Sequence, residues 1–283
     1  MRVRYKFSAK FTRKNRKPSN TNEHKVAFPT QAREVIRISD ILLEIIDARF
    51  IDKTRNKELE EEVKKAGKKI IFVLNKVDLI DIKNLKKDYD LSSIKPYVLF
   101  SVKNKIGRAR LREIINIEAK RSDFKKAKIG IIGYPNTGKS SVINVLSGGK
   151  RAGTSSNAGF TKAIQKIKFS KDIMLLDSPG VIFSGEENSL SANVVKKHVE
   201  IGVKDYEKVK YPDLVVNEIM KTHKKIFDNF YRIDSEEDAD ILLEILGKKW
   251  NFLKKGGIAD RDRVARKILK AWQEGKIRAE QYV

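Results

Sequence analysis

Hydrophobic and polar positions change their period along the chain. From residue 27 to about residue 200, short apolar runs rich in β-branched residues are separated by amphipathic stretches, which is typical of strands joined by helices. This pattern predicts an α/β domain with a mostly parallel sheet that helices cover on both faces. The six predicted strands are 41–47, 69–75, 97–101, 127–133, 164–169 and 172–177.

The apolar period becomes helical after about residue 200. We therefore expect a small all-α domain over 201–283, following the sheet domain over 27–200. Its last helix is predicted to begin after Asp260, as cap, and to end at Gly275. The apolar face of this helix comprises Val264, Ile268, Ala271 and Trp272, and its basic face comprises Arg263, Arg266, Lys267 and Lys270.

The first 26 residues carry a run of cations in which Tyr5, Phe7 and Phe11 are interleaved. A flexible arm of this kind suits phosphate contacts and base stacking on irregular RNA, although a solvated basic tail has the same composition. The basic face of the last helix is a second candidate RNA surface, with ordinary solvent exposure as the alternative. The cations before the first acid are Arg2, Arg4, Lys6, Lys10, Arg13, Lys14, Arg16 and Lys17.

The composition narrows the classes of protein. A net charge of +24 favours a polyanionic partner. The absence of cysteine excludes disulfides and thiolate metal sites, and three scattered histidines cannot form a zinc cluster. We expect His198 and His223 to be surface residues. Without a long apolar run or a signal peptide, we expect a cytoplasmic protein with no membrane partner, monomeric in isolation.

The segment GYPNTGKS, residues 133–140, lies between an apolar run and an amphipathic stretch. This is the context of a phosphate-binding loop, in which glycines turn backbone N–H groups onto phosphate oxygens at the start of a helix. Lys139 is expected to reach the β- and γ-phosphates, and Ser140 is expected to bind Mg²⁺. The candidate contacts here are Asn136, Thr137, Gly138, Lys139, Ser140 and Ser141.

Two downstream features complete the expected phosphate and magnesium site. DSPG, residues 177–180, follows a predicted strand, so Asp177 would hold Mg²⁺ through a water molecule and Gly180 would lie near the phosphates. Thr161, in a loop between the two motifs, would add a second hydroxyl to the metal; it is equally well explained as an ordinary loop residue.

NKVD, residues 75–78, ends another predicted strand and resembles the guanine-reading motif of the translation-factor-related GTPases. The Asp78 carboxylate can accept from the guanine ring N–H and the exocyclic amine, while the Lys76 stem covers the base. FSVK, residues 100–103, resembles the S-A-K motif of that superfamily. The candidate base contacts are Asn75, Lys76, Asp78, Ser101, Val102 and Lys103.

The order of these motifs is circularly permuted, since NKVD and SVK precede the phosphate loop, Thr161 and DSPG. With Asp47-Ala48-Arg49 after the first strand and LGKK, KGG and GK near the end, the chain resembles the circularly permuted GTPases of ribosome assembly. The resemblance implies a P-loop GTPase fold, GTP or GDP with Mg²⁺, and ribosomal RNA of a large-subunit precursor as partner. A GTPase acting on another RNA, such as a tRNA-linked process, and a module that binds nucleotide only structurally are the alternatives.

Val181 stands where Ras-type enzymes place the glutamine that orients the attacking water. We therefore expect slow intrinsic hydrolysis that a ribosomal particle raises. The resemblance implies a K⁺ ion near the phosphates, for which Asn136 is the candidate ligand; a hydrogen bond within the loop is the other role for Asn136. His24 is a candidate catalytic residue because relatives carry an N-terminal histidine. The permuted order also gives the DSPG segment a direct covalent path, through 181–212, into the helical domain.

Overall fold

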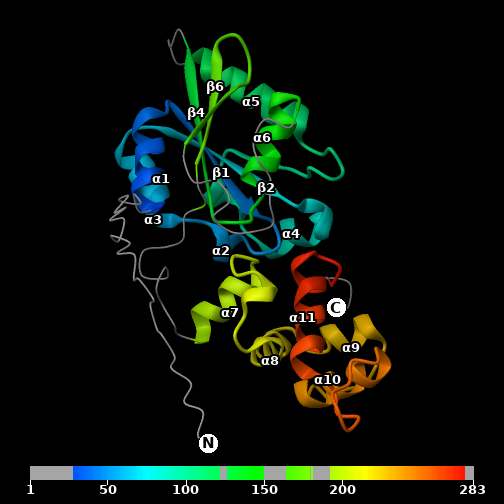
Figure 1. Ribbon diagram of the computed structural model, residues 1–283. Coiled ribbons are helices and arrows are strands. Elements are labelled where there is room, and N and C mark those ends of the chain that lie inside the picture. Colours follow the sequence, from blue (N-terminus) through cyan, green and yellow to red (C-terminus); the bar gives the residue numbers. More distant parts are fainter. Residues whose placement is uncertain (1–27, 122–125, 150–163, 179, 181–191, 278–283) are drawn as a thin grey trace, which may run out of the picture.

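The computed structural model describes residues 28–121, 126–149, 164–178, 180 and 192–277. They form a sheet domain and a smaller helical domain that lies beyond one edge of the sheet (Figure 1). Thr161, Val181, His24 and the basic arm lie outside the described residues.

The six predicted strands form one sheet in the order β3-β2-β1-β4-β6-β5, in which only β5 is antiparallel to its neighbour. This confirms the α/β fold class. All seven residues of the central strand β1 are buried, because helices cover both faces of the sheet. The strands are β1 (Ile41–Asp47), β2 (Lys69–Asn75), β3 (Tyr97–Leu99), β4 (Ala127–Ile132), β5 (Gln165–Lys168) and β6 (Ile173–Asp177).

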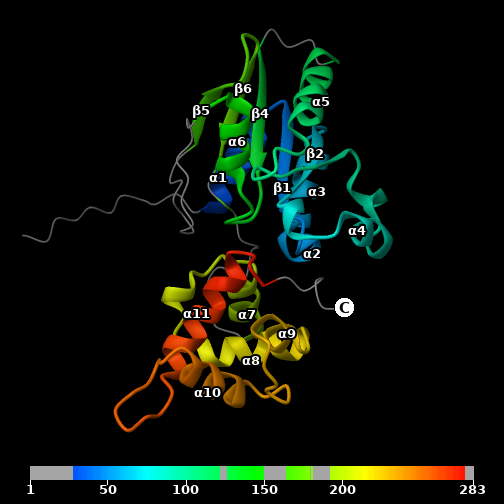
Figure 2. The same ribbon diagram turned by 90° about the vertical axis from the view of Figure 1, so that its right-hand side faces the viewer.

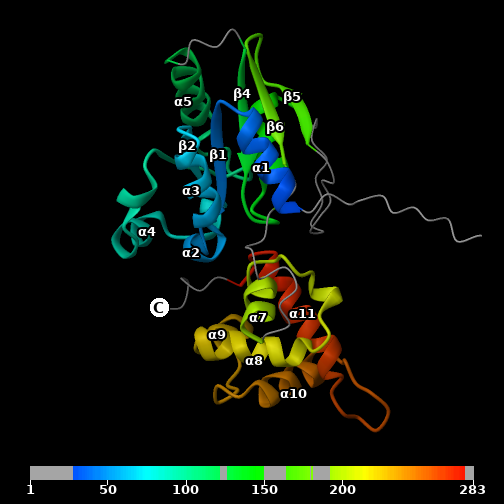
Figure 3. The same cartoon turned by 90° about the vertical axis from the view of Figure 1, so that its left-hand side faces the viewer.

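Successive β1 side chains point to opposite faces and enter different clusters. Leu42 packs with α1 and α3, while Leu43 packs with α5 and α6 on the other face (Figures 2 and 3). The helical elements of this domain are α1 (Phe28–Ile38), α2 (Ile51–Thr54), α3 (Lys57–Lys65), η1 (Val77–Leu79), α4 (Ile82–Asp88), η2 (Leu91–Ile94), α5 (Arg108–Arg121) and α6 (Lys139–Ser147).

The helical domain has its own core, in which Trp272 and Phe227 are buried. Val199 of α7 belongs to this core, so by packing α7 is part of the helical domain. By this packing the helical domain includes α7, which precedes the boundary expected at residue 201. The elements are α7 (Ala192–Glu200), η3 (Tyr206–Lys208), α8 (Pro212–Thr222), α9 (Ile226–Tyr231), α10 (Ala239–Lys249) and α11 (Arg261–Gln273).

The last helix, α11, has the predicted ends. The Asp260 carboxylate accepts from the Arg263 N–H at its start, and Gly275 adopts a φ of 70° just beyond its end. Val264, Ile268 and Trp272 are buried as predicted. None of the helices in the described ranges combines the length and apolarity that crossing a membrane requires.

Candidate functional site

The sheet topology brings the predicted motifs to one edge. Asn75 ends β2, the phosphate loop follows β4, and Asp177 ends β6. Because β2, β4 and β6 are parallel strands of one sheet, with β1 between β2 and β4 and with β6 next to β4, their carboxyl ends converge. The edge faces the helical domain (Figure 1).

The phosphate loop is held by close backbone packing. Gly133 has a φ of 143°, and a Cβ there would lie 2.4 Å from the Ile45 carbonyl oxygen. Gly138 has a φ of 97°, and a Cβ there would lie 2.4 Å from the Asn75 Nδ2. Both positions therefore require glycine, as the sequence pattern indicates.

Lys139 lies inside this loop and is only 7% exposed. Its Nζ donates to the carbonyl oxygens of Gly133 at 3.0 Å and Tyr134 at 2.8 Å. Burial lowers the pKa of Lys139 to about 8, and the Asp177 carboxylate opposes that shift only in part. A buried ammonium held by neutral carbonyls is well placed to receive an anion.

Asp177 and Ser140 form the candidate metal corner. Ser140 Oγ donates to Asp177 Oδ2 at 3.2 Å, whereas Asp177 Oδ1 is buried without a hydrogen-bond partner. Burial raises the pKa of Asp177, with Lys139 and Ser140 acting in the opposite sense. Within the described ranges, no cluster of three or more His, Cys, Asp or Glu side chains could hold a metal. A hydroxyl and one orphaned carboxylate oxygen fit Mg²⁺ that completes its shell with water and phosphate.

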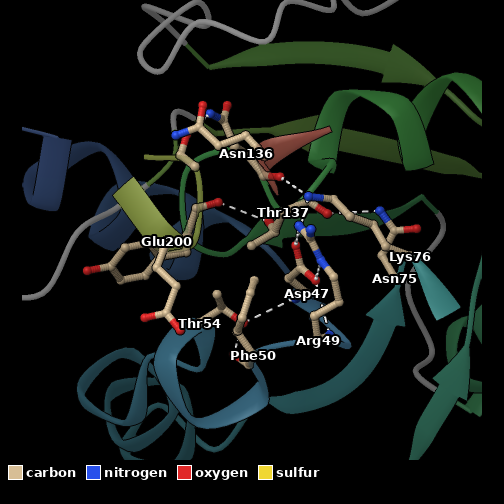
Figure 4. A network of polar contacts seen from close by, with 12 residues as sticks. Asp47, Arg49, Phe50, Thr54, Asn75, Lys76, Asn136, Thr137 and Glu200 are labelled. Carbon is tan, nitrogen blue, oxygen red and sulfur yellow. Dashed lines mark hydrogen bonds and ion pairs between the residues drawn. The ribbon is translucent and has the colours of Figure 1, made fainter. Parts of the chain in front are cut away.

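NKVD lies directly against the phosphate loop. Asn75 Nδ2 donates to the Thr137 carbonyl oxygen at 2.8 Å, and Lys76 Nζ donates to that of Asn136 at 2.7 Å (Figure 4). Lys76 has a φ of 66°, which turns the chain sharply after β2. These bonds join segments about sixty residues apart and fix the base-reading motif relative to the loop.

SVK meets the other end of NKVD. Ser101 Oγ donates to Asp78 Oδ1 at 2.6 Å and accepts from the Asn104 N–H at 3.0 Å. Val102 packs against the core beneath, and Lys103 is exposed. The second Asp78 oxygen is not used by this bond, so the carboxylate retains acceptor capacity at the place where a guanine edge would lie.

Asp47 supports Lys76 from below. Its carboxylate accepts from Lys76 Nζ at 2.8 Å and from Arg49 Nε and Nη2 at 3.0 and 2.7 Å (Figure 4). Burial raises the pKa of Asp47, but Lys76 and Arg49 outweigh that effect and hold it well below the ordinary value. In the sequence, Asp47 and Arg49 indicated only the resemblance to a family, and no role in the site was predicted for them. The signal that could have indicated this role is an acidic residue at the end of a strand, with an arginine two residues later.

The phosphate loop also contacts the helical domain. Tyr134 is fully buried and packs with Ile201 and Val203, and the Asn136 Nδ2 donates to the Gly202 carbonyl oxygen. The alternative role expected for Asn136 was a hydrogen bond within the loop; the bond that its Nδ2 makes reaches the helical domain instead.

A second contact between the domains centres on Glu200, whose side chain is 1% exposed. Its carboxylate accepts from Lys53 Nζ at 2.6 and 2.7 Å and lies 3.2 Å from His223 Nε2. Trp272 Nε1 donates to the Glu200 carbonyl oxygen at 3.0 Å, and its ring lies 6.3 Å from that of Phe50. His223 is thus part of an interface, which corrects its prediction as a surface residue. His198 lies beside the Tyr134 ring, with centroids 6.4 Å apart.

Gly180, the last residue of DSPG, lies against the phosphate loop. A Cβ there would come within 2.7 Å of Pro135 Cα and 3.0 Å of Lys139 Nζ, so only glycine fits. Thr161 and Val181 cannot be placed, since both fall in the ranges that the structure leaves undescribed.

The four basic residues of α11 differ in their surroundings. The Arg266 guanidinium donates to the carbonyl oxygens of Tyr206, Glu207 and Val209 and to Asp262, so its donors are used within the domain. Arg263 lies 4.0 Å from the Phe252 ring centroid and Lys267 lies 3.9 Å from that of Trp250. Lys270 lies on the side of the sheet domain, above the Tyr206 ring.

A family model described as a 50S ribosome-binding GTPase matches residues 128–248, beginning in the strand that leads into the phosphate loop. An uncharacterized GTP-binding protein of Methanocaldococcus jannaschii is 37% identical over 257 residues, which cover 89% of this chain and 66% of that protein. Nucleolar GTP-binding protein 2 of Saccharomyces cerevisiae is 34% identical over 257 residues, which cover 86% and 51%. The chain therefore spans between half and two thirds of the length of these relatives.

The solved structure of GDP-bound YlqF has a TM-score of 0.60 and 27% identity, covering 87% of this chain and 95% of that one. The GNP-bound YlqF from T. maritima has the same TM-score and 25% identity, covering 89% and 98%. The fold, the motif order and these relatives agree. The chain belongs to the circularly permuted GTPases of ribosome assembly, the group of YlqF and nucleolar GTP-binding protein 2.

Proposed function

We propose that this protein binds and hydrolyses GTP as a molecular switch in the assembly of the large ribosomal subunit. One observation carries the proposal most directly. Lys76 and Asn75 of NKVD bond to the backbone of the phosphate loop, so a base-reading and a phosphate-holding element share one site. The names of the family model and of nucleolar GTP-binding protein 2 support the ribosomal part.

Each residue has a distinct role in the proposed reaction. The loop N–H groups and Lys139 bind the phosphates and neutralise their charge, while Asp78 selects guanine. Ser140, Asp177 and Thr161 would hold Mg²⁺, which draws charge from the β- and γ-phosphate oxygens when bound. Gly180 lets the DSPG segment approach the phosphates, where its N–H can contact the γ-phosphate.

None of the residues named above is proposed to orient the attacking water. Because Val181 cannot hydrogen-bond a water through its side chain, we expect slow turnover that a ribosomal particle raises. Asn136 and K⁺ belong to the same proposal. The Asn136 Nδ2 already donates to Gly202, and a cation would bind the amide oxygen, because the amide nitrogen is only a donor.

The basic surfaces supply the proposed RNA contacts. On α11, Arg263 and Lys267 lie over aromatic rings and are exposed, so they present charge together with a stacking surface. Arg266 is removed from the proposed RNA contacts because its donors are already used. The arm residues Arg2, Arg4, Arg13, Lys14, Arg16 and Lys17 remain part of the proposal.

Turnover and cosedimentation together test this function. GTP hydrolysis is measured in potassium and in sodium buffer, with and without large ribosomal subunits or their precursors, and binding is measured with a GTP analogue and with GDP. We expect stimulation by the particle and tighter sedimentation with the analogue. Equal rates with and without the particle, or preferential binding to tRNA, would contradict the ribosomal assignment; Lys139→Ala controls for contaminating hydrolysis.

A further inference from the structure

A cavity of about 680 Å³ lies between the two domains, beside the phosphate loop. From the sheet domain it is lined by Lys76, Gly138 and Ser141, which belong to the base-reading motif, the loop and the first turn of α6. A nucleotide held by both motifs must run along these residues. The opposite wall comes from the helical domain and includes Tyr206, Lys270 and Glu274.

The two walls are fixed relative to each other. The Asn136 amide bonds to Gly202, and Glu200 receives two bonds from Lys53. At the end of α11, a Cβ on Gly275 would lie 2.6 Å from Leu79 Cδ1, directly after NKVD. The helical domain therefore sits against both motifs, and its side chains along the cavity face the candidate nucleotide.

The charged side chains that line the cavity differ in how they are paired. Arg49 and Lys76 share the Asp47 carboxylate, and Glu274 pairs with Lys276 at 2.7 Å. Asp205 accepts from the Glu207 N–H as the cap of η3. Lys270 is exposed and makes no ion pair with any carboxylate in the described part of the chain; its Nζ lies 5.8 Å from the Tyr206 ring centroid.

We propose that Lys270 is a nucleotide contact supplied by the helical domain, its ammonium binding a phosphate group of the guanine nucleotide. This rests on the proposed function, since it requires GTP or GDP in the cavity. The N-terminal turn of α6 directs N–H groups to the phosphates, and an exposed cation on the facing wall adds charge from the other side. Under this proposal Lys270 binds the nucleotide and is no longer one of the RNA contacts expected from the basic face of α11. Nucleotide affinity becomes sensitive to the position of the helical domain.

The test is the dissociation constant of a fluorescent GDP analogue for the full chain. We expect Lys270→Ala and Lys270→Gln to weaken binding about tenfold, because one exposed charge contact to phosphate is lost. Lys270→Arg should retain most of the affinity, since it preserves the charge. The loss should shrink at high salt, which screens an exposed contact. Lys221→Ala is the control, as Lys221 is an exposed lysine of the same domain that does not line the cavity.

The outcomes separate the two proposals. Unchanged affinity in Lys270→Ala, with loss of binding in Lys139→Ala, would overturn the role of Lys270 and leave the GTPase function standing. Equal weakening in Lys221→Ala and Lys270→Ala would also overturn it, because general basic charge would then explain the effect. No measurable GDP or GTP binding by the unchanged chain would overturn the proposed function itself.

Discussion

The two walls of the candidate nucleotide site are built by different means. The wall from the sheet domain consists of residues whose motif spacing fixes their place, such as Lys76 and Gly138. The wall from the helical domain consists of ordinary residue types, such as Lys270 and Tyr206, that tertiary packing alone brings there. The first wall can be identified from sequence, whereas the second exists only when both domains are placed together. Four changes test whether the walls act as differently as they are built.

The largest effect should come from the motif wall. Lys139→Ala removes a buried ammonium at the phosphates, so we expect GTP turnover to fall on the order of 10²- to 10³-fold. Steady-state kinetics with saturating Mg²⁺ measure this. Lys128→Ala, an exposed lysine on β4, is the control and should leave turnover unchanged. Normal turnover in Lys139→Ala would remove the loop from the mechanism.

A change at the contact between the walls should reduce stability rather than chemistry. Glu200→Ala leaves Lys53 and His223 without their buried partner, and we expect a loss of about 2 kcal/mol in the free energy of unfolding. Burial raises the pKa of Glu200, but His223 and Lys53 hold it below the ordinary value. This stabilisation is therefore present above the unfolded pKa and is lost as the pH falls through the lower folded pKa. Urea unfolding at neutral and acid pH, compared with Glu61→Ala at an exposed glutamate, checks both statements.

The support beneath Lys76 should affect affinity without affecting selectivity. Asp47→Asn keeps the shape but removes the charge that holds Lys76, and we expect nucleotide binding to weaken about tenfold. The preference for GDP over ADP should persist, because we propose that Asp78, not Asp47, reads the base. Asp78→Asn is the matched variant and should lose that preference. If Asp47→Asn also loses selectivity, its role extends to the base itself.

The smallest effect concerns pH. The pKa of Lys139 without nucleotide is about 8, so a growing fraction of molecules carries a neutral Lys139 as the pH rises. These molecules must take up a proton before Lys139 can bind phosphate as a cation. Between pH 7 and 8.5, the dissociation constant of GDP should increase about fourfold. Lys139→Arg does not titrate in this range, so its affinity, whatever its size, should stay constant. A constant affinity in the unchanged chain would contradict the lowered pKa.

Local patterns predicted most of the fold. β1 and β2 have the predicted bounds, and α11 begins and ends at its predicted cap and glycine, because alternation, capping and φ preferences act over a few residues. The phosphate loop and NKVD were identified for the same reason. β3 ends at Leu99, two residues before the predicted end.

Contacts between the domains could not be predicted in this way. His223 has no local pattern that distinguishes an interface residue from a surface residue, yet it lies 5.2 Å from the Trp272 ring centroid and beside Glu200. Arg266 looks like its exposed neighbours in sequence, but the carbonyl groups that it binds belong to residues 57 to 60 positions earlier in the chain. The pairing of such residues depends on how the two domains are placed.

The phosphate loop serves two functions within eight residues: it forms the candidate nucleotide site, and it contacts the helical domain. In the pattern G-x-x-x-x-G-K-S, the fixed positions serve the nucleotide and the free positions accept any residue. Here two free positions are Tyr134 and Asn136, and both side chains contact the helical domain. Grafting the loop of a single-domain GTPase into this chain should therefore preserve a nucleotide site but remove the side-chain contacts through which the loop binds the helical domain.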